Sequence, residues 1–464
     1  MNMLNLLNNQ IYPFLFRNYL FPLWNFIKHE TCLTTMKHLN RTQWYPREKI
    51  LQIQLQRLRQ LLEHAYSNTN YYDRVLKENG LIPPFDNLSL SDFSRLPILT
   101  KSIIQEQTTE LIAKNYSSAD LFKNASGGST GHPTIIYQDH KRRAIRQADA
   151  IRHDAWTGWR LGEKSAILWG AERDIFDPIK FKDKIRHFFT ENAINLNAFD
   201  LTKAKCKKFV EALNQARPTL LIGYAGALNR FAQIIKTEQY DIHSFRLNLK
   251  GIVSSAETLS YDTRNLIESV FKIKVFDRYG SREVGLIASE CKVHNGMHIN
   301  AEHVVVEIVD NDNKLLPFGQ IGDVIVTDLI NYGMPIIRYK LGDRAALNDH
   351  YCKCGRGLPL MSNVVGRITD FFIGKNGEEI HGEYFTHLLY GIPQILQFQF
   401  VQEDIDKLVI KLVAKNNLDK SFIENLKAEC GRILGDIHIT IEYLDKIPPA
   451  KSGKYLFTIS HVNR

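Results

Sequence analysis

Short apolar runs alternate with stretches of helical pattern through the middle of this chain, from about residue 100 to residue 345. The runs are three to five residues long and lie at 165–169, 219–223, 252–255 and 324–326. Such runs are typical of buried strands, and their alternation with helices indicates βα units in which helices cover a sheet. We therefore predict an α/β protein. No repeat of 20–50 residues is present, which argues against a solenoid or a propeller.

The pattern changes after Gly366. Segments 396–400, 408–412 and 437–441 alternate apolar and polar residues with the period of a strand, and a helical stretch over 418–434 separates the last two. This combination predicts a small α+β domain appended to a larger one.

The 464 residues are enough for two or three domains. We predict a large N-terminal domain of helix-covered β-sheets over residues 1–366 and a small, mobile C-terminal α+β domain over residues 367–464. Residues 1–100 form a helical lead-in, which includes an amphipathic helix over residues 46–66. The apolar stripe of that helix is expected at Leu51, Leu55, Leu58, Leu62 and Ala65.

The net charge limits the partners only partly. Lys and Arg number 59 against 50 Asp and Glu, a formal charge of +9 that suits an anionic ligand, an anionic membrane surface or nucleic acid. Basic runs at 141–143 and 203–208 contribute to this charge, and a solvated helix face is their ordinary interpretation. Because the sequence has no ribonucleoprotein signature, zinc-finger spacing or heptad zipper, we exclude nucleic acid as a partner.

The cysteines and the N-terminal segment indicate the compartment. Six cysteines are too few for a secreted disulfide scaffold, and no cleavable signal peptide is evident, so we expect a cytoplasmic protein. Residues 1–27 are apolar but interrupted by polar residues and prolines, whereas a spanning helix needs about 20 predominantly apolar residues. The aromatic side chains of this N-terminal arm either rest on a membrane interface or a partner, or pack on the chain's own domain. These are Phe14, Phe16, Tyr19, Phe21 and Trp24.

One segment combines three glycines with three hydroxyl residues: Ser126, Gly127, Gly128, Ser129, Thr130 and Gly131. Backbone N–H groups and hydroxyls in such a turn can bind a chain of phosphates. It is not a Walker A loop, because no Gly-Lys-Ser/Thr follows at the required spacing. A flexible turn without a ligand is the alternative.

Four further segments carry residues suited to chemistry. Residues 277–283 contain a Tyr-Gly turn followed by Glu283, which could offer a carboxylate to a metal cation or could simply be solvated. Asp343 follows a glycine turn and could accept both hydroxyls of a ribose. Residues 366–370 lie at the predicted domain boundary, and residues 449–454 form a flexible basic loop.

These five segments occur in one order, and in that order the chain resembles the adenylate-forming superfamily of acyl- and aryl-CoA ligases. More closely it is similar to the phenylacetate–CoA ligase branch and, within it, to CapK-like proteins found with capsule-polysaccharide genes. The resemblance spans residues 44–460 and includes the segments 44–48, 70–72 and 96–101.

The resemblance implies a role for each segment. The loop from Ser126 to Gly131 would hold the β- and γ-phosphates of ATP, with Thr130 also near Mg²⁺. Tyr279 would stack on the adenine, and Asp277 would lie near its amino group. The residues that frame the base would be Ser255, Ala256, Glu257, Asp277, Arg278, Tyr279, Gly280 and Ser281.

The resemblance also implies the catalytic residues, Lys454, Glu283 and Thr130. Glu283 would ligate Mg²⁺, and Lys454 would reach the carboxylate and the α-phosphate during adenylation. Asp343 would hold the ribose hydroxyls, and Arg367 would assist at the ribose or the phosphate. The small domain would pivot near Thr369 and Asp370, although Thr369 stands where many members have an acidic residue. Arg282 occupies a position that is often Ser or Thr in the superfamily, and both departures leave the thioester step less certain.

A separate cluster indicates a metal. Cys352 and Cys354 form a Cys-x-Cys-Gly knuckle, and with Cys291 and a nearby histidine they suit a tetrahedral structural zinc ion. Some relatives carry a comparable site, and the Gly-Met-His turn favours His298 as the fourth ligand, with His294 as the rival. The alternative is three buried free cysteines. Cys32, Cys206 and Cys430 are expected to have no such role.

The predicted function is therefore ATP-dependent activation of a carboxylic acid as its acyl-adenylate, with release of pyrophosphate. The acyl group then passes to CoA or another acceptor, with polysaccharide biosynthesis as the suggested context. The alternatives are an adenylylating or acyl-transferring enzyme that does not use CoA, for example one that forms an amide on a sugar, and a non-catalytic scaffold. The expected cofactors are ATP, Mg²⁺, structural Zn²⁺ and CoA. The expected acyl pocket comprises Tyr137, Tyr224, Gly226 and Ser254, and the sequence leaves the acid, the acceptor and the oligomeric state open.

Overall fold

The computed structural model describes residues 11–125, 134–169, 192–198, 201–364, 366–367, 371–389, 392, 394–416, 418–448 and 456–462. The chain divides into two compact units. The large unit comprises Met1–Leu341 and Ala345–Asn363, and the small unit comprises Gly342–Arg344 and Val364–Arg464. The sequence pattern did not predict that three residues from within a strand would group with the small unit.

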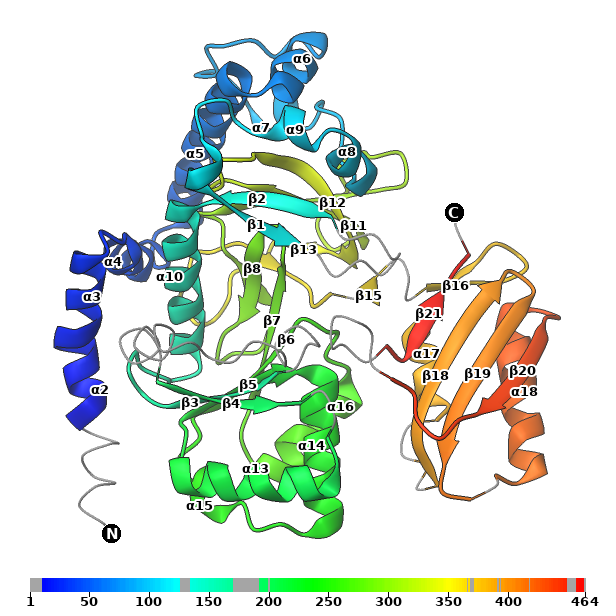
Figure 1. The fold of residues 1–464 in the computed structure, drawn as a ribbon. Coiled ribbons are helices and arrows are strands. Elements are labelled where there is room, and N and C mark those ends of the chain that lie inside the picture. The colour runs from blue at the N-terminus through cyan, green and yellow to red at the C-terminus, as the bar shows by residue number, and fades with distance from the viewer. Residues whose placement is uncertain are drawn as a thin grey trace. The chain divides into compact units, whose positions relative to one another are not determined.

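A nine-stranded sheet forms the centre of the large unit (Figure 1). Its order is β13-β14-β9-β8-β7-β6-β5-β3-β4, in which the strands from β7 to β4 are parallel and those from β7 to β13 are antiparallel. The strands are β3 (Ser165–Trp169), β4 (Ala193–Asn197), β5 (Leu220–Tyr224), β6 (Gly251–Ser255), β7 (Val275–Ser281), β8 (Gly285–Glu290), β9 (Met297–Ile299), β13 (Leu347–Asn348) and β14 (Leu360–Met361). Three of the predicted apolar runs are strands β3, β5 and β6, which confirms them.

Alternate residues of these strands fill two separate cores. Leu221, Ile252 and Val275 pack with the helices on one face, α13 (Lys203–Ala216), α14 (Ala225–Glu238), α15 (His243–Arg246) and α16 (Tyr261–Phe271). Leu220, Val253 and Phe276 point to the other face and pack with α4 (Cys32–Thr42) and α10 (His140–Trp156). A parallel sheet covered on both faces explains why its strands are continuous apolar runs in the sequence.

Helix starts in this unit follow capping residues that are visible in the sequence. The side chains of Asp139, Thr202 and Ser260 each accept a hydrogen bond from the backbone N–H three residues later. Such caps satisfy one of the backbone donors that a helix start leaves free.

A second sheet and the helical lead-in complete the large unit. Strands β10 (Val304–Val309), β11 (Gly322–Asp328) and β12 (Ile336–Ala345) are neighbours in it, and β11 contains the fourth predicted run. A separate hairpin joins β1 (Leu121–Ala125) to β2 (Ile135–Asp139). The lead-in helices are α5 (Arg47–Asn68), α6 (Asn70–Glu78), α7 (Leu90–Phe93), α8 (Lys101–Glu106) and α9 (Thr108–Leu111), followed by the 3₁₀ turn η3 (Ser118–Asp120).

The amphipathic helix predicted over residues 46–66 is α5, but its buried face differs from the prediction. Leu51 is exposed, and the buried ridge is Ile50, Gln54, Leu58, Leu61, Leu62 and Ala65. Gln54 belongs to this ridge because its Nε2 donates to the carbonyl of Val304 at 2.7 Å. Gln54 can therefore occupy a core position, because its amide forms a hydrogen bond with a strand carbonyl.

The N-terminal arm consists of α2 (Tyr12–Leu15), one π-helical turn η2 (Phe16–Leu20) and α3 (Phe21–Ile27). Phe16 and Phe21 are buried in the core that α4 and α10 share. Part of the arm therefore packs on its own unit, as one of the two interpretations expected. Within the part of the chain that the structure covers, none of the helices has the length and apolar character needed to cross a bilayer.

The small unit is an α+β domain, and three of its strands match the predicted period-two segments. Its main sheet has the order β20-β19-β18-β21, and a two-stranded sheet pairs β16 with β17. The elements are β15 (Gly366–Arg367), β16 (Phe371–Ile373), β17 (Glu379–His381), α17 (Gly382–His387), β18 (Ile395–Asp404), β19 (Lys407–Ala414), α18 (Lys420–Leu434), β20 (His438–Tyr443) and β21 (Thr458–Ser460). Its own core includes Phe372, Phe385, Phe400, Ile410 and Leu426.

A buried ion pair in the large unit is joined to the lead-in by a hydrogen bond from Thr42. Glu302 is fully buried and accepts hydrogen bonds from Arg152 at 2.8 Å and from the Thr42 hydroxyl at 2.7 Å. Burial by itself would raise the pKa of Glu302, but the Arg152 guanidinium outweighs it and lowers that pKa to about 2. The carboxylate is therefore charged in the folded protein.

We expect Glu302→Ala to lower the free energy of unfolding by about 3–5 kcal/mol, because Arg152 would remain buried without its partner. The matched control is Asp73→Ala, whose partner Lys77 is 53% exposed and which should cost only about 0–1 kcal/mol. The folded-state pKa of Glu302 lies below the ordinary 4.5, so its stabilisation is complete above that pH and is lost as the pH falls toward 2. Urea denaturation measures both effects, and equal losses in the two variants would contradict the assignment.

Candidate active site and metal centre

Among the predicted nucleotide-binding residues, segments 255–257 and 277–281 of the large unit lie together at one edge of the nine-stranded sheet. Strands β5, β6 and β7 are parallel neighbours, so their carboxyl ends meet at the same edge. Tyr224 is the register partner of Ser255, which is in turn the partner of Arg278. In open α/β sheets, ligands bind outside the carboxyl ends of the strands. The fold therefore brings segments 224–226, 254–257 and 277–281 together at the edge where a ligand is expected.

The loop after β6 is tied to the start of α14. Ala256 has a φ of +68°, a left-handed conformation that non-glycine residues rarely adopt. Glu257 then accepts a hydrogen bond from the backbone N–H of Gly226 at 2.7 Å. This bond joins two segments that were predicted for different roles, since Glu257 was expected at the adenine and Gly226 in the acyl pocket.

Asp277 lies at the centre of a polar network that the sequence did not reveal. Its backbone N–H donates to Glu290 Oε2 at 2.9 Å, and its Oδ2 accepts from Asn363 Nδ2 at 3.4 Å. Glu290 in turn accepts from Arg264 at 2.8 Å. Burial, together with the neighbouring carboxylate of Glu290, raises the pKa of Asp277 to about 7.

Glu290 and Asn363 were missed because each stands alone in its segment of sequence. The available signal was a carboxylate at the end of the buried strand β8, where a charged residue requires a partner. Arg264 lies 26 residues away from Glu290 on α16, and no local spacing connects the two.

The predicted Tyr-Gly turn is instead part of a strand. Tyr279 and Gly280 belong to β7, and a β-bulge between them changes the register against β8. A Cβ on Gly280 would lie 2.6 Å from the carbonyl oxygen of Gly285, so only glycine fits. The turn comes at residues 282–284, which puts Glu283 at its centre.

The turn that carries Glu283 is held by the hairpin that flanks the glycine- and hydroxyl-rich loop. The carbonyl of Arg282 accepts from Asn124 of β1 at 3.0 Å and from Gln138 of β2 at 3.3 Å. The carbonyl of Glu283 accepts from Arg142 at 3.0 Å. Segment 126–133, with Ser126 to Gly131, lies outside the described residues, but its flanks Ala125 and Ile135 are register partners.

The small unit contains the predicted ribose ligand. Asp343 lies within β12 and not after a turn, although Gly342 before it has a φ of +80°. It is 7% exposed and is the register partner of Arg367 in β15, so two residues predicted for the ribose face each other across a strand pair. Thr369, Asp370 and Lys454 lie outside the described residues.

The predicted acyl-pocket residues Tyr137, Tyr224, Gly226 and Ser254 lie on four different elements of the large unit, β2, β5, α14 and β6. Tyr137 is half-buried on β2, and its backbone N–H contacts Met334 Sδ at 3.4 Å. Tyr224 is 2% exposed, and its ring centroid lies 3.9 Å from that of Trp169 at the end of β3. The hydroxyl of Ser254 is buried and finds no hydrogen-bond partner among the described residues. Its position at the carboxyl edge leaves a polar atom for a ligand to satisfy.

Four donor atoms converge in the predicted cysteine cluster. The candidate ligand atoms of Cys291, His298, Cys352 and Cys354 all lie within 4.8 Å of one another. Cys291 Sγ is 3.7 Å from Cys352 Sγ, and Cys354 Sγ is 3.3 Å from His298 Nε2. Two sulfurs bound at ~2.3 Å to one tetrahedral ion would lie about 3.8 Å apart, so these separations fit a metal of that geometry.

The surroundings orient His298 toward this centre. Its Nδ1 faces the carbonyl of Leu358 at 3.4 Å, which leaves Nε2 for a ligand role. The rival residue, His294, instead contacts Glu290 Oε2 through Nδ1 at 3.1 Å and is not part of the cluster. The structure therefore favours His298 over His294.

The knuckle that carries Cys352 and Cys354 is clamped to the lead-in. Gly357 donates its N–H to the carbonyl of Gln43 at 3.1 Å, and a Cβ on Gly357 would lie 1.9 Å from the carbonyl oxygen of Tyr45. These contacts of Gly357 hold residues 352–357, which include two residues of the centre, against a segment about 310 positions earlier in the chain.

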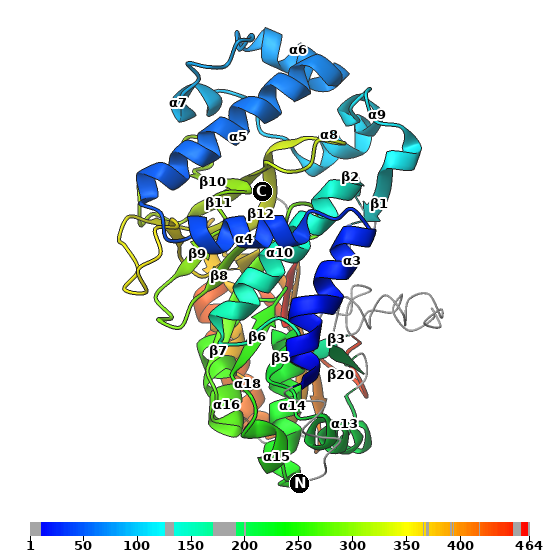
Figure 2. The same ribbon diagram turned by 90° about the vertical axis from the view of Figure 1, so that its left-hand side faces the viewer.

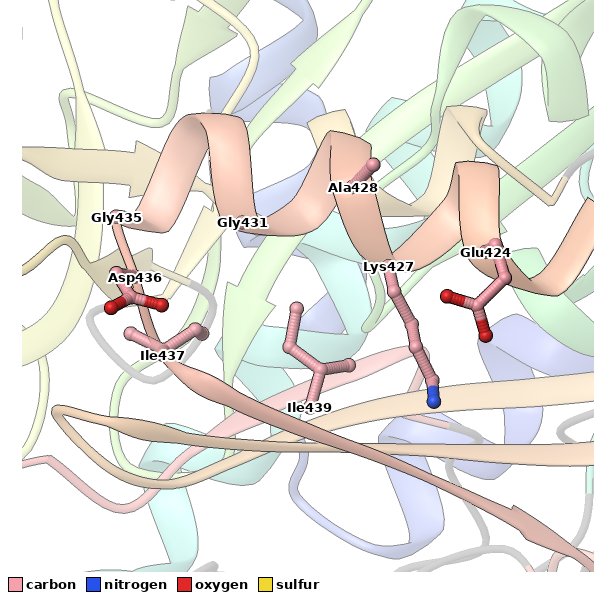
Figure 3. Close-up of a pocket in the computed structure, with 8 residues that line it drawn as sticks. All are labelled: Glu424, Lys427, Ala428, Gly431, Gly435, Asp436, Ile437 and Ile439. Carbon is pink, nitrogen blue, oxygen red and sulfur yellow. The ribbon is translucent and has the colours of Figure 1, made fainter.

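A hollow of about 470 Å³ lies on the small unit between α18 and β20. Lys427 and Glu424 reach into it from the helix, Ile439 lines it from β20, and Ile437 lines it from just before that strand (Figure 3). None of the predicted site residues lines it. This hollow is therefore distinct from the strand edge described above.

Comparison with curated proteins gives relatives along most of the chain. Residues 372–461 match the family described as CapK C-terminal domain. Protein CapK of Staphylococcus aureus is 26% identical over 428 residues, which cover 89% of this chain and 90% of that protein. The phenylacetate-coenzyme A ligase of Thermus thermophilus is 25% identical over 357 residues, which cover 76% of this chain and 77% of that enzyme.

Solved structures share the fold. A 2-hydroxyisobutyryl-CoA ligase in its postadenylation state matches with a TM-score of 0.69 and 20% identity over 88% of both chains. ATP-bound MatB from Rhodopseudomonas palustris matches with a TM-score of 0.52 and 15% identity over 75% of this chain and 68% of that one. The predicted fold class, a large helix-covered domain followed by a small α+β domain, is confirmed.

Proposed function

Because this chain is an adenylate-forming ligase of the CapK-like, phenylacetate–CoA ligase branch, we propose that it activates a carboxylic acid with ATP as the acyl-adenylate. The reaction releases pyrophosphate, and the acyl group then passes to CoA. Relatives named phenylacetate-coenzyme A ligase, from Thermus thermophilus and Pseudomonas putida, support this choice of acceptor. ATP, Mg²⁺ and CoA are the ligands that the proposal requires.

The observation that carries the proposal is the common edge of β5, β6 and β7. Three segments predicted to bind nucleotide and acid end at this edge, in adjacent parallel strands. Holding ATP and a carboxylate together there would make the attack on the α-phosphate effectively intramolecular. In this arrangement segments 255–257 and 277–281 frame the adenine, and the unpartnered Ser254 hydroxyl serves a polar group of the ligand.

Charge is the main obstacle to this reaction, since one anion attacks another. Glu283 would hold Mg²⁺, whose charge offsets the phosphates, and its turn is bonded to the hairpin on both sides of the loop that contains Thr130. In the small unit, Asp343 would accept the ribose hydroxyls with Arg367 beside it in register. Lys454 would supply a second cation at the α-phosphate.

The acceptor and the biological context follow from the resemblance alone. Transfer to an amine on a sugar, within polysaccharide biosynthesis, is the alternative to CoA. Tyr137, Tyr224 and Gly226 would form part of the acyl pocket, and the close ring contact between Tyr224 and Trp169 favours a flat or apolar acyl group.

Release of pyrophosphate with a panel of carboxylic acids tests the proposal. One or more acids should give ATP-dependent release, and the active acid should then form a thioester with CoA. If the acid is adenylated but no thioester forms, the proposed acceptor changes from CoA to an amine. No release from any acid, together with no ATP binding by calorimetry, would overturn the proposal in favour of a non-catalytic scaffold.

We also propose that Cys291, His298, Cys352 and Cys354 bind one structural zinc ion. Three thiolates and one imidazole are a donor set typical of closed zinc sites, and the four atoms lie within 4.8 Å of one another. The ion would join the knuckle of Cys352 and Cys354 to Cys291 and His298, a role in folding and not in the reaction.

Purified protein that has not met a chelator should contain one zinc ion per chain by metal analysis. Cys352→Ser is expected to lose the metal and to lower the thermal midpoint of unfolding, because metal binding is coupled to folding. Cys206→Ser is the control, since Cys206 is also buried but lies outside the cluster, and it should keep the metal. Wild-type protein without zinc would contradict the assignment.

A further inference from the structure

The N-terminal arm exposes a regular apolar stripe. Between residues 14 and 27 the exposed large hydrophobic residues recur with the period of a helix, and we call this set the outer stripe. It consists of Phe14, Leu15, Tyr19, Leu23, Phe26 and Ile27, with exposed fractions from 42% to 77%. The side of a surface helix that faces water is normally polar. Asn18 is the exposed polar residue within this span, and it turns its amide back onto the carbonyl of Phe14 at 2.8 Å.

The opposite side of the arm is firmly packed. Phe16 and Phe21 are 1% and 0% exposed in the core shared with α4 and α10. Arg17 donates to the carbonyl of Leu161 at 3.1 Å, and a Cβ on Gly162 would lie 2.9 Å from the carbonyl of Pro13. The corner to α4 is closed by Asn25, whose side chain accepts from the N–H of Leu33 at 3.2 Å. Because the inner side is anchored in this way, the arm holds the outer stripe at the surface of the large unit.

The charges around the stripe have one sign. Residues 1–29 contain Arg17 and Lys28 and no Asp or Glu. Lys28 is exposed and lies over the Trp24 ring at 5.3 Å, beside the end of the stripe. Figure 2 shows that α4 lies on the same side of the large unit as α3, and α4 adds the exposed Lys37 and Arg41. Glu30 is the one acidic residue among residues 1–42.

We propose that the outer stripe docks the protein on an anionic lipid surface. Aromatic and aliphatic side chains with flanking cations and almost no acids suit the boundary between headgroups and acyl chains. An apolar protein groove would need no excess of basic residues around the contact, so the charge favours lipid over a protein partner. The described part of the arm, from residue 11 on, contains no helix long and apolar enough to cross a bilayer, so the proposal places it at the lipid surface. This proposal does not depend on the reaction proposed above.

Sedimentation of the full chain with vesicles tests the proposal. The protein should bind vesicles that contain phosphatidylglycerol more strongly than vesicles of phosphatidylcholine alone, and added salt should weaken the binding. Leu23→Asp combined with Phe26→Asp should lower the partition coefficient at least tenfold. These side chains are 50% and 77% exposed, so folding should be unaffected, and circular dichroism checks this.

A matched control uses the same two residue types elsewhere. Leu247→Asp with Phe318→Asp changes side chains that are 69% and 59% exposed and should leave binding unchanged. Equal loss in both double variants would overturn the proposal, and so would the absence of binding to anionic vesicles. If light scattering instead shows a dimer that only Leu23→Asp with Phe26→Asp disrupts, the stripe binds a second copy and the lipid proposal is wrong.

Discussion

Glu283→Gln is expected to slow formation of the acyl-adenylate by at least a hundredfold while the fold stays intact. The change keeps the shape of the side chain but removes the negative charge that would hold Mg²⁺ beside the phosphates. A hundredfold loss corresponds to ~2.7 kcal/mol of the activation barrier. The turn itself should not move, because it is held through the backbone carbonyls of Arg282 and Glu283.

Pyrophosphate release under single-turnover conditions, with the acid found by the panel, measures this effect. Glu211→Gln is the control, since Glu211 is exposed on α13, and its rate should equal that of the wild type. If Glu283→Gln keeps a rate within about threefold of the wild type, under ~0.7 kcal/mol, Glu283 does not hold the metal.

Lys454→Ala is expected to abolish pyrophosphate release and to spare the second half-reaction. An ammonium group at the α-phosphate offsets the charge that develops during adenylation, so its loss should raise that barrier by about 3–4 kcal/mol or more. By family resemblance, transfer from the adenylate to CoA takes place without this lysine at the reacting atoms. Thioester formation from supplied acyl-adenylate should therefore continue at a rate near that of the wild type.

The two half-reactions are measured separately, with pyrophosphate release for the first and thioester formation for the second. Lys451→Ala is the matched control, because Lys451 lies three positions earlier in the same basic segment. Equal loss of both half-reactions in Lys454→Ala would indicate a structural role. Retention of both would mean that another residue supplies the cation.

The fold class could be predicted because its signals are local. A strand covered on both faces must be apolar along its whole length, and the runs that became β3, β5 and β6 show this directly. In the small unit, period-two segments became β18, β19 and β20 for the same kind of reason. The prediction of the buried face of α5 was less accurate. The hydrogen bond of Gln54 to Val304 buries a polar residue that a pattern of hydrophobic residues alone places at the surface.

The candidate site was also predictable only in part. Segment 277–283 was recognised as one of the ordered motifs and segment 255–257 through the family resemblance, and the fold then placed the strand ends that carry them side by side. The order of the motifs does not predict the residues that hold these segments in place. Examples are Glu290 with Arg264 and the hairpin residues Asn124 and Gln138, whose hydrogen bonds join positions far apart in the chain. The expected turn at Tyr279 became a bulged strand because Gly280 packs directly against the backbone of Gly285.

The sequence by itself determined the order of elements, the family resemblance and the residue types available for a metal centre, because these depend on neighbours along the chain. The tertiary structure decided which histidine joins Cys291, Cys352 and Cys354, since His298 and His294 are only four positions apart and both suit zinc. His294 turns toward Glu290, while His298 faces Cys354. It also decided which side of the N-terminal arm is buried, because an arm that is apolar all round has no periodicity to mark its inner face. Phe16 and Phe21 pack into the core that α4 and α10 share, and Phe26 remains exposed to solvent.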